Sequence, residues 1–509
     1  MKFPDYRSKR DAQKKTKKSG PKAGQPAKPL EGRFALEAFE PRLMLDAQPL
    51  ATLAGGALTV NTTDGNDSYV ISRTSAGGGG GDIVKIKNVV TGTEETYGNA
   101  TQGVTSIAAD GKKGNDTFDL SALSTTTPVT ITGGEGTNTI VAPGTTHVWN
   151  ITAAGAGTVG QVTFTGVTNL TGGSGDDSYN FTGAGQLGSF FLDETAGGTD
   201  TVNLAASTVG VTLDLGKTGE QTVSTNLKLT LSAPDAFENV TGSAQVDTIS
   251  GNAEDNTIIG GGGADILKGG LGDDTFVISG TTGSVSDEGG EDKIDFSALT
   301  ADATVAKLAD GTFTLTTGTD SLALDGIEKL AGGTGVNSLD FSLSATGVVV
   351  NLAGGYSTDF TELTGFTKVT GSGHDDTIIG SDQADVLIGG AGDDVIVGNA
   401  GADTIDGGTG IDRLVESRDV DFTLTDTSLA DGTDTDTLTS IEAATLTGGA
   451  SANTIDASAF SGDVTLDGGS TILLAALNGS AGVQTTDGSQ FDLTLTTLLS
   501  SLNQKDGVR

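Results

Sequence analysis

The chain has 509 residues, of which 66 are Asp or Glu and 28 are Lys or Arg, so its formal net charge is -38. Such a charge excludes nucleic acid and anionic membranes as favourable partners, because both would repel the chain, whereas it favours divalent cations. The absence of cysteine excludes disulfides and thiolate metal sites, and two histidines leave little for zinc chemistry. The 79 glycines, beside one tryptophan, indicate many tight turns and no large aromatic core.

Residues 1–33 form a basic leader. They hold eleven Lys and Arg against three acidic residues, with few apolar side chains, which predicts a disordered segment. The leader lacks the apolar stretch of a secretory signal peptide, and no run in the chain is apolar enough to predict a transmembrane segment. In the following segment, 34–47, residues 40–45 (Glu-Pro-Arg-Leu-Met-Leu) resemble the LEPR-XLL motif near the N-termini of large, often repeat-bearing bacterial proteins, with Phe39 in place of the leucine. The alternative is a linker with a few buried anchors.

After residue 50 the sequence consists of short β-prone stretches rich in Thr, Val, Ile and Leu, separated by Gly, Asn and Asp. No part of it predicts a long helix. We expect β-rich regions over residues 50–241, 278–370 and 416–509. These regions surround two segments with strict internal repeats.

The two repeat segments keep a period of nine. The first, 242–277, holds four repeats, and the second, 371–415, holds five. Each repeat has Gly at position one, Asp or Asn at position six and an apolar residue at position eight. Glycine permits the positive φ of a tight turn, and turn carbonyls with an aspartate supply the oxygen donors that a hard cation prefers. The apolar residues predicted to face the core are Ile249, Ile258, Leu267, Phe276, Ile378, Leu387, Ile396, Ile405 and Leu414.

These repeats resemble the RTX nonapeptide G-G-x-G-x-D-x-U-x of haemolysin-type secreted proteins. The resemblance implies Ca²⁺ as the ligand and a β-roll in which two nonapeptides complete one coil. The aspartates at position six are then the candidate metal ligands. They are Asp247, Asp265, Asp274, Asp376, Asp385, Asp394, Asp403 and Asp412.

In such a roll, aspartates two repeats apart stack at the strand spacing of ~4.8 Å and can share one ion. The predicted pairs are Asp247/Asp265, Asp376/Asp394, Asp394/Asp412 and Asp385/Asp403. The pair Asn256/Asp274 lacks one charge and is predicted to bind more weakly. Isolated copies of the repeat carry Asp67, Asp116, Asp177, Asn138, Asn337 and Asn453. With no neighbour at nine or eighteen residues, they are predicted to be structural turns, and His147 and His374 to be packing and loop residues.

The expected fold is therefore all-β: an elongated parallel β-roll or β-helix solenoid behind a disordered basic leader. The resemblance implies export from a Gram-negative bacterium by a type I secretion machinery, to a secreted, extracellular or cell-surface location. No export signal stands out in residues 491–509.

Two functions are compatible with these observations. The favoured one is a non-enzymatic, structural or adhesive protein that folds on calcium outside the cell and contacts a cell surface or matrix. The alternative is a secreted hydrolase that carries RTX repeats as a secretion and folding module. No H-E-x-x-H motif, G-x-S-x-G motif or cysteine nucleophile occurs, and the few aromatic residues argue against a sugar-binding cleft.

Overall fold

The computed structural model describes residues 48–76, 82–99, 101–123, 126–142, 144–280 and 282–467, with the strands at 471–474, 482–483 and 490–493. The predicted disordered leader, the LEPR-XLL-like segment and most of 491–509 lie outside these residues. The described residues form 49 strands and no helix, which confirms the all-β prediction. In this part of the chain no helix therefore meets the length and hydropathy needed to cross a bilayer.

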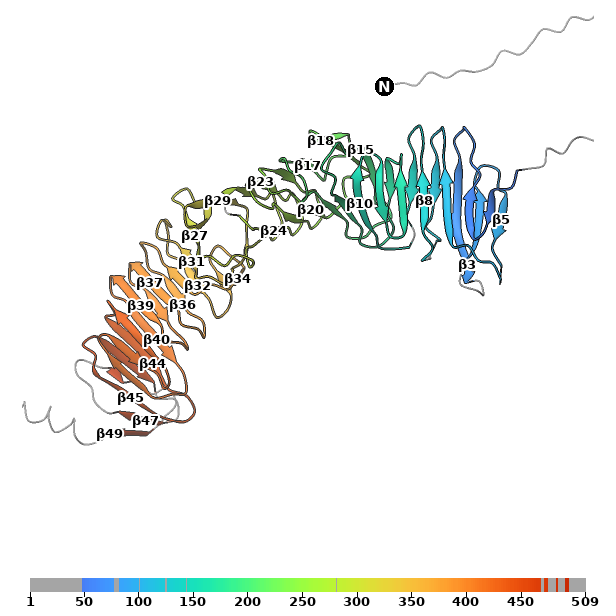
Figure 1. Ribbon diagram of the computed structural model, residues 1–509. Coiled ribbons are helices and arrows are strands. Elements are labelled where there is room, and N and C mark those ends of the chain that lie inside the picture. Colours follow the sequence, from blue (N-terminus) through green and yellow to red (C-terminus); the bar gives the residue numbers. More distant parts are fainter. Residues whose placement is uncertain are drawn as a thin grey trace, which may run out of the picture. The chain divides into compact units, whose positions relative to one another are not determined.

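In the two repeat segments, consecutive strands alternate between two sheets, and each pairs in parallel with the strand one coil away (Figure 1). In the first repeat segment, one sheet contains β20 (Asn239–Thr241), β22 (Thr257–Ile259) and β24 (Thr275–Val277), and the other contains β21 (Thr248–Ser250) and β23 (Ala264–Lys268). Partners in each sheet are eighteen residues apart, as for Thr257 beside Thr275. Two nonapeptides thus complete one coil, as predicted.

The second repeat segment has the same arrangement. The strands β36 (Thr377–Ile379), β38 (Val395–Val397) and β40 (Arg413–Ser417) pair in one sheet, opposite β37 (Val386–Ala391) and β39 (Thr404–Thr409) in the other. Ile378 lies beside Ile396, again eighteen residues on. The described sheets contain 15, 9, 17 and 8 strands, so the coils continue well beyond the repeats.

Outside the repeats, antiparallel hairpins are inserted into the parallel sheets. One joins β10 (Val148–Ala153), β11 (Ala156–Val159) and β12 (Val162–Thr165). A second joins β27 (Ala303–Lys307), β28 (Phe313–Thr317) and β29 (Asp320–Asp325). Because each insertion lengthens its coil, the spacing between stacked residues is no longer eighteen.

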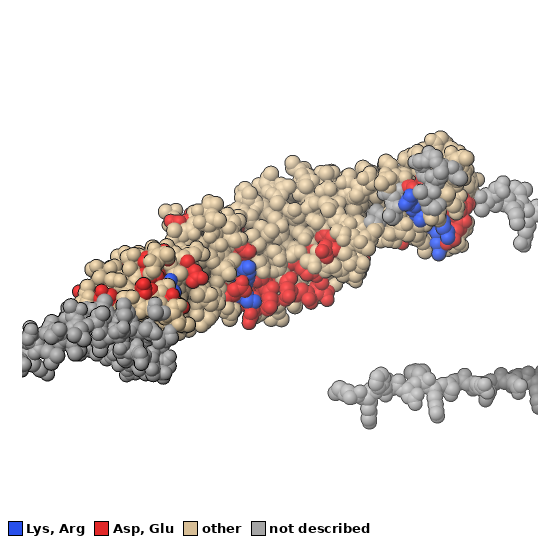
Figure 2. Space-filling view, turned by 90° about the horizontal axis from the view of Figure 1, so that it is seen from below, with Lys and Arg blue, Asp and Glu red and all other residues tan. Residues whose placement is uncertain are grey.

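Acidic side chains gather over one face of the solenoid, with few Lys or Arg among them (Figure 2). Exposed acids at position five of the repeats also stack coil on coil. The backbone N–H of Asp273 donates to Asp255 Oδ1 at 2.8 Å, and that of Glu291 donates to Asp273 Oδ1 at 2.9 Å. Like charges are therefore held one strand spacing apart, which disfavours the folded coil unless counterions approach.

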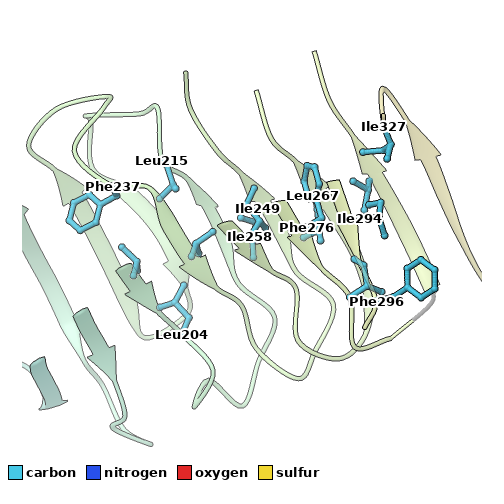
Figure 3. Packing of buried hydrophobic residues seen from close by; sticks show 14 of the residues in the cluster. Leu204, Leu215, Phe237, Ile249, Ile258, Leu267, Phe276, Ile294, Phe296 and Ile327 are labelled. Carbon is cyan, nitrogen blue, oxygen red and sulfur yellow. The ribbon is translucent and has the colours of Figure 1, made fainter. Parts of the chain in front are cut away.

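The core lies between the two sheets and is built mainly from the middle residue of each short strand. All nine apolar residues predicted at position eight are at most 2% exposed, which confirms their assignment. Figure 3 shows Ile249, Ile258, Leu267 and Phe276 between the strands of successive coils. Burying one such side chain contributes about 2 kcal/mol, so each coil is stabilised mainly by its neighbours.

Candidate metal centres

The aspartates at position six stack in ladders along the turns. In the second repeat segment, Asp394 Oδ1 accepts the backbone N–H of Asp376 at 2.8 Å, and Asp412 Oδ1 accepts that of Asp394 at 2.9 Å. On the other side of the coil, Asp403 Oδ1 accepts the N–H of Asp385 at 2.8 Å. The structure therefore places the predicted partners next to each other. The direct contact between them is a hydrogen bond from a backbone N–H to a carboxylate oxygen.

The second carboxylate oxygen divides these turns into two kinds. In a closed turn, the oxygen accepts the N–H of the residue at position two. Ser372 N donates to Asp376 Oδ2 at 2.5 Å, and its hydroxyl donates to Oδ1 at 2.8 Å. Ser381 donates both its N–H and its hydroxyl to Asp385 Oδ2, so the buried Asp385 Oδ1 has no hydrogen-bond partner among the described residues. Ser243 closes its turn as Ser372 does, through bonds to both oxygens of Asp247. A cation would have to displace these bonds to reach the carboxylate.

In an open turn, the residue at position two has a left-handed backbone and its N–H does not reach the aspartate. Gly390 has φ of 120°, and Asn399 reaches 66°, which is uncommon for a residue with a side chain. The second oxygen is then buried and, among the described residues, has no hydrogen-bond partner. This holds for the Oδ2 atoms of Asp274, Asp394, Asp403 and Asp412. Buried polar atoms without a partner are rare in proteins and point to a missing ligand.

Backbone carbonyls line the space around the open carboxylates. A Cβ added at Gly389 would lie 2.3 Å from Asp394 Oδ2 and 2.5 Å from the carbonyl oxygen of Gly407 on the next coil. A Cβ at Gly408 would lie 2.0 Å from the carbonyl oxygen of Gly390. Carboxylate and carbonyl oxygens therefore crowd into the space that the glycines leave. This donor set is the one that Ca²⁺ takes, so the residues fit the implied metal.

Burial disfavours the ionised form of the open carboxylates when no cation is bound. It raises the pKa of Asp394 to about 6 and that of Asp403 to about 7, and neighbouring carboxylates add to the effect. The pKa values of Asp412 and Asp274 are also raised, chiefly by burial. A divalent cation at these oxygens would favour the ionised form and reverse the effect.

The first repeat segment also has a ladder on each side of the coil, and the ladder of Asn256 and Asp274 extends beyond residue 277. The N–H of Asp247 donates to Asp265 Oδ1 at 2.9 Å, as expected for that pair. Asp274, however, has a further neighbour: its N–H donates to Asp292 Oδ1 at 2.8 Å, eighteen residues on. The carboxylate of Asp287 also lies beside these two. The signal was present as Asp287-Glu-Gly-Gly-Glu-Asp292, a degenerate repeat one coil after Asp274.

Four of the isolated copies, those with Asp67, Asp116, Asn138 and Asp177, also stack on a neighbouring turn, although none has a repeat nine or eighteen residues away. Asp116 Oδ1 accepts the N–H of Asp67, 49 residues earlier, and Asp200 Oδ1 accepts that of Asp177, 23 residues earlier, both at 2.8 Å. The prediction assumed eighteen-residue coils, whereas insertions lengthen these coils. Asp116 is moreover open: its Oδ2 has no partner in the described part of the chain, and Lys112 at position two has φ of 63°.

These features define a class of protein, a parallel β-solenoid whose turns hold stacked carboxylates and carbonyls arranged for hard cations. The family described as RTX calcium-binding nonapeptide repeat (4 copies) matches residues 241–276, 370–405 and 379–414. The chain is an RTX-type calcium-binding repeat protein, and its coils form a β-roll over these segments. No curated protein matches the chain.

Proposed function

We propose that the protein is a secreted or cell-surface structural or adhesive protein whose coils fold on calcium outside the cell. The observation that carries this proposal is the set of buried aspartate oxygens without partners in the open turns of both repeat segments. Calcium binding itself follows from the repeats. The structural role, the adhesive role and the location are our inferences.

The energetics favour a chain that folds only where calcium is plentiful. Extracellular calcium modules typically bind with Kd of ~10⁻⁴–10⁻³ M. At ~1 mM calcium and Kd of ~0.1 mM, one site adds ~1.4 kcal/mol to stability, so several sites decide whether the coils form. In a cytosol poor in calcium, the stacked carboxylates would repel one another and keep the coils open. An unfolded chain suits export through a type I secretion machinery.

We infer a scaffold rather than an enzyme. The buried carboxylates of the repeats lie in turns that face other turns of the same solenoid, where they hold successive coils together. The exposed acidic face in Figure 2 is an extended surface on which calcium could bridge the protein to a cell surface or matrix.

Cell fractionation tests the proposed location. In the source bacterium, we expect the protein in the culture supernatant, or on intact cells where added protease removes it. Calcium chelation should make the surface-bound protein more sensitive to protease, because the coils open. A protein that stays in the cytoplasm and resists protease in intact cells would contradict the proposal.

A further inference from the structure

A second kind of carboxylate cluster lies outside the family-matched segments, where the turn at 172–177 stacks on the turn at 194–200. The flanking strands are β13 (Asn169–Thr171), β14 (Ser178–Phe181), β15 (Gly188–Asp193) and β16 (Thr201–Asn203). β13 pairs with β15, and β14 pairs with β16, both in parallel. Residues at the same place in the two turns are therefore neighbours.

Three acidic side chains meet between these turns. One oxygen each from Asp177, Glu194 and Asp200 lies within 4.8 Å of the other two. All three side chains are buried, at no more than 2% exposure. Calcium binds oxygens at 2.3–2.6 Å, so two ligands on opposite sides of the ion are about 5 Å apart. The cluster is thus compact enough for a single ion.

The Glu194 carboxylate is the unusual member. It takes the place that glycine holds at position one, directly over Gly172, where a Cβ would lie only 2.0 Å from Glu194 Oε1. The Tyr179 hydroxyl donates to Oε1. The other oxygen, Oε2, is buried and has no hydrogen-bond partner within the described residues. A buried carboxylate oxygen without a donor needs a positive charge.

The other two members are held in place by their neighbours. Asp177 Oδ2 accepts the N–H of Gly173 at 2.7 Å, and Asp200 Oδ1 accepts the N–H of Asp177 at 2.8 Å. His147, predicted to be a packing residue, is buried with its Nδ1 2.7 Å from Asp177 Oδ1. Within the described chain, no Lys or Arg pairs with any of the three carboxylates.

The second repeat segment contains an equivalent buried glutamate that has a cationic partner. Glu416 occupies the same place in its turn, and its Oε1 accepts the N–H of Gly398 at 2.6 Å. There, however, Arg418 supplies a cation, with its Nε 3.8 Å from Glu416 Oε2. Two buried glutamates at equivalent positions thus differ in whether the chain itself provides the positive charge.

We propose that Asp177, Glu194 and Asp200 bind a calcium ion between these two turns, a site additional to the RTX repeats. The ion would supply Glu194 with the positive charge that Arg418 supplies to Glu416. Burial raises the pKa of Glu194 to about 9 and that of Asp200 to about 7 when no ion is present, which is consistent with a site built for a bound cation. The site would fasten the coils of the N-terminal half, which lie outside the matched segments.

The position of the only tryptophan provides a selective assay. The Trp149 ring stacks on Tyr179, with centroids 5.7 Å apart and an angle of 7°, and Tyr179 bonds to Glu194. Residues 242–277 and 371–415 contain no Trp or Tyr. Terbium, a luminescent substitute for calcium, would therefore be sensitised by Trp149 at this site and not by the repeats themselves.

The experiment uses the full chain and follows terbium luminescence on selective excitation of tryptophan. We expect a saturable signal that calcium displaces and that magnesium displaces poorly, because Mg²⁺ demands shorter bonds and octahedral geometry. Glu194→Gln should lower terbium affinity by about tenfold or more, the scale of one lost charge-assisted contact. Glu416→Gln is the matched control and should leave the signal unchanged.

Asp200→Asn is a second test, in case Glu194→Gln does not fold, and it should weaken the signal on the same scale. The proposal is overturned if wild-type protein gives no tryptophan-sensitised signal, or if a folded Glu194→Gln or Asp200→Asn variant binds terbium as wild type does. Isothermal titration of total calcium separates the two proposals, because the repeats would still bind calcium if this site does not.

Discussion

Replacing Asp394 with asparagine should have opposite effects with and without calcium. Burial raises the pKa of Asp394 from 3.8 to about 6, so keeping this carboxylate ionised in the ion-free coil costs about 3 kcal/mol. Asparagine removes that cost, and it can keep the Oδ1 that accepts the N–H of Asp376. Asn256 shows that an amide fits at position six of a closed turn, where its Oδ1 accepts the N–H of Asn252 and its Nδ2 donates to the Glu238 carbonyl at 3.0 Å. In EGTA, Asp394→Asn should therefore retain more β-structure than wild type.

With calcium, the same variant should lose stability. Asp394 lies between Asp376 and Asp412 in one ladder, so its carboxylate can serve two ions. At ~1.4 kcal/mol for each site, the loss is about 3 kcal/mol. Asp403 also lies between two carboxylates, because it accepts the N–H of Asp385 and donates its own N–H to Asp436 Oδ1 at 2.9 Å, so Asp403→Asn should cause a loss of similar size.

Two measurements follow these effects, namely isothermal titration for the number of bound ions and far-UV circular dichroism for the β-structure in EGTA and in calcium. Asp376→Asn is the comparison from a closed turn, where Ser372 already occupies both carboxylate oxygens, and it should lose less calcium than Asp394→Asn. Equal losses for Asp394→Asn with and without calcium would refute the reasoning, because they would show an ordinary structural role. If Asp394→Asn loses no more calcium than Asp376→Asn, whose aspartate ends the ladder at Val348, Asp394 does not serve two ions.

Three further results are expected. In EGTA, lowering the pH from about 7 to about 4 should restore β-structure. The folded-state pKa values of Asp403 and Asp265 are raised to about 7 and 6, so the folded coil binds more protons than the unfolded chain over this range. In calcium, the same acidification should release the ion and lower the melting temperature. Gly389→Ala should abolish calcium binding at its turn in isothermal titration, whereas Gly373→Ala, whose Cβ would meet nothing within 4 Å, should bind as wild type does. Asn256→Asp should make the first repeat segment more dependent on calcium in thermal melting, since the aspartate cannot donate to the Glu238 carbonyl and costs about 1–3 kcal/mol without an ion.

The repeating part of the fold was predictable because its period fixes both the turn and the core. Gly at position one and Ile, Leu or Phe at position eight recur every nine residues. Two such units return the chain to the same sheet, as Ile378 beside Ile396 shows. Stacking outside the repeats was not predictable, because hairpins such as β27–β28–β29 change the coil length without any periodic signal.

The sequence predicted which residues belong to the candidate sites, but not which of their turns are open. Position six identified Asp376 and Asp394 equally, yet only Asp394 has a free, buried oxygen. The difference depends on the backbone at position two, where Ser372 closes its turn and Gly390, with φ of 120°, opens its own. The residue type at position two does not settle this, because the N–H groups of Gly173 and Asn252 also donate to the side chain at position six of their turns. Glu194 could not have been found, because only the register of the coils places it over Gly172.

The central claim is that calcium holds the coils of this protein together, and far-UV circular dichroism of the full chain in EGTA, followed by added calcium, tests it most directly. We predict that the β-structure signal of the ion-free protein at neutral pH is weak and increases cooperatively over ~0.1–1 mM calcium, whereas magnesium at the same concentration leaves it low. A strong β-structure signal in EGTA that calcium does not change would contradict the account.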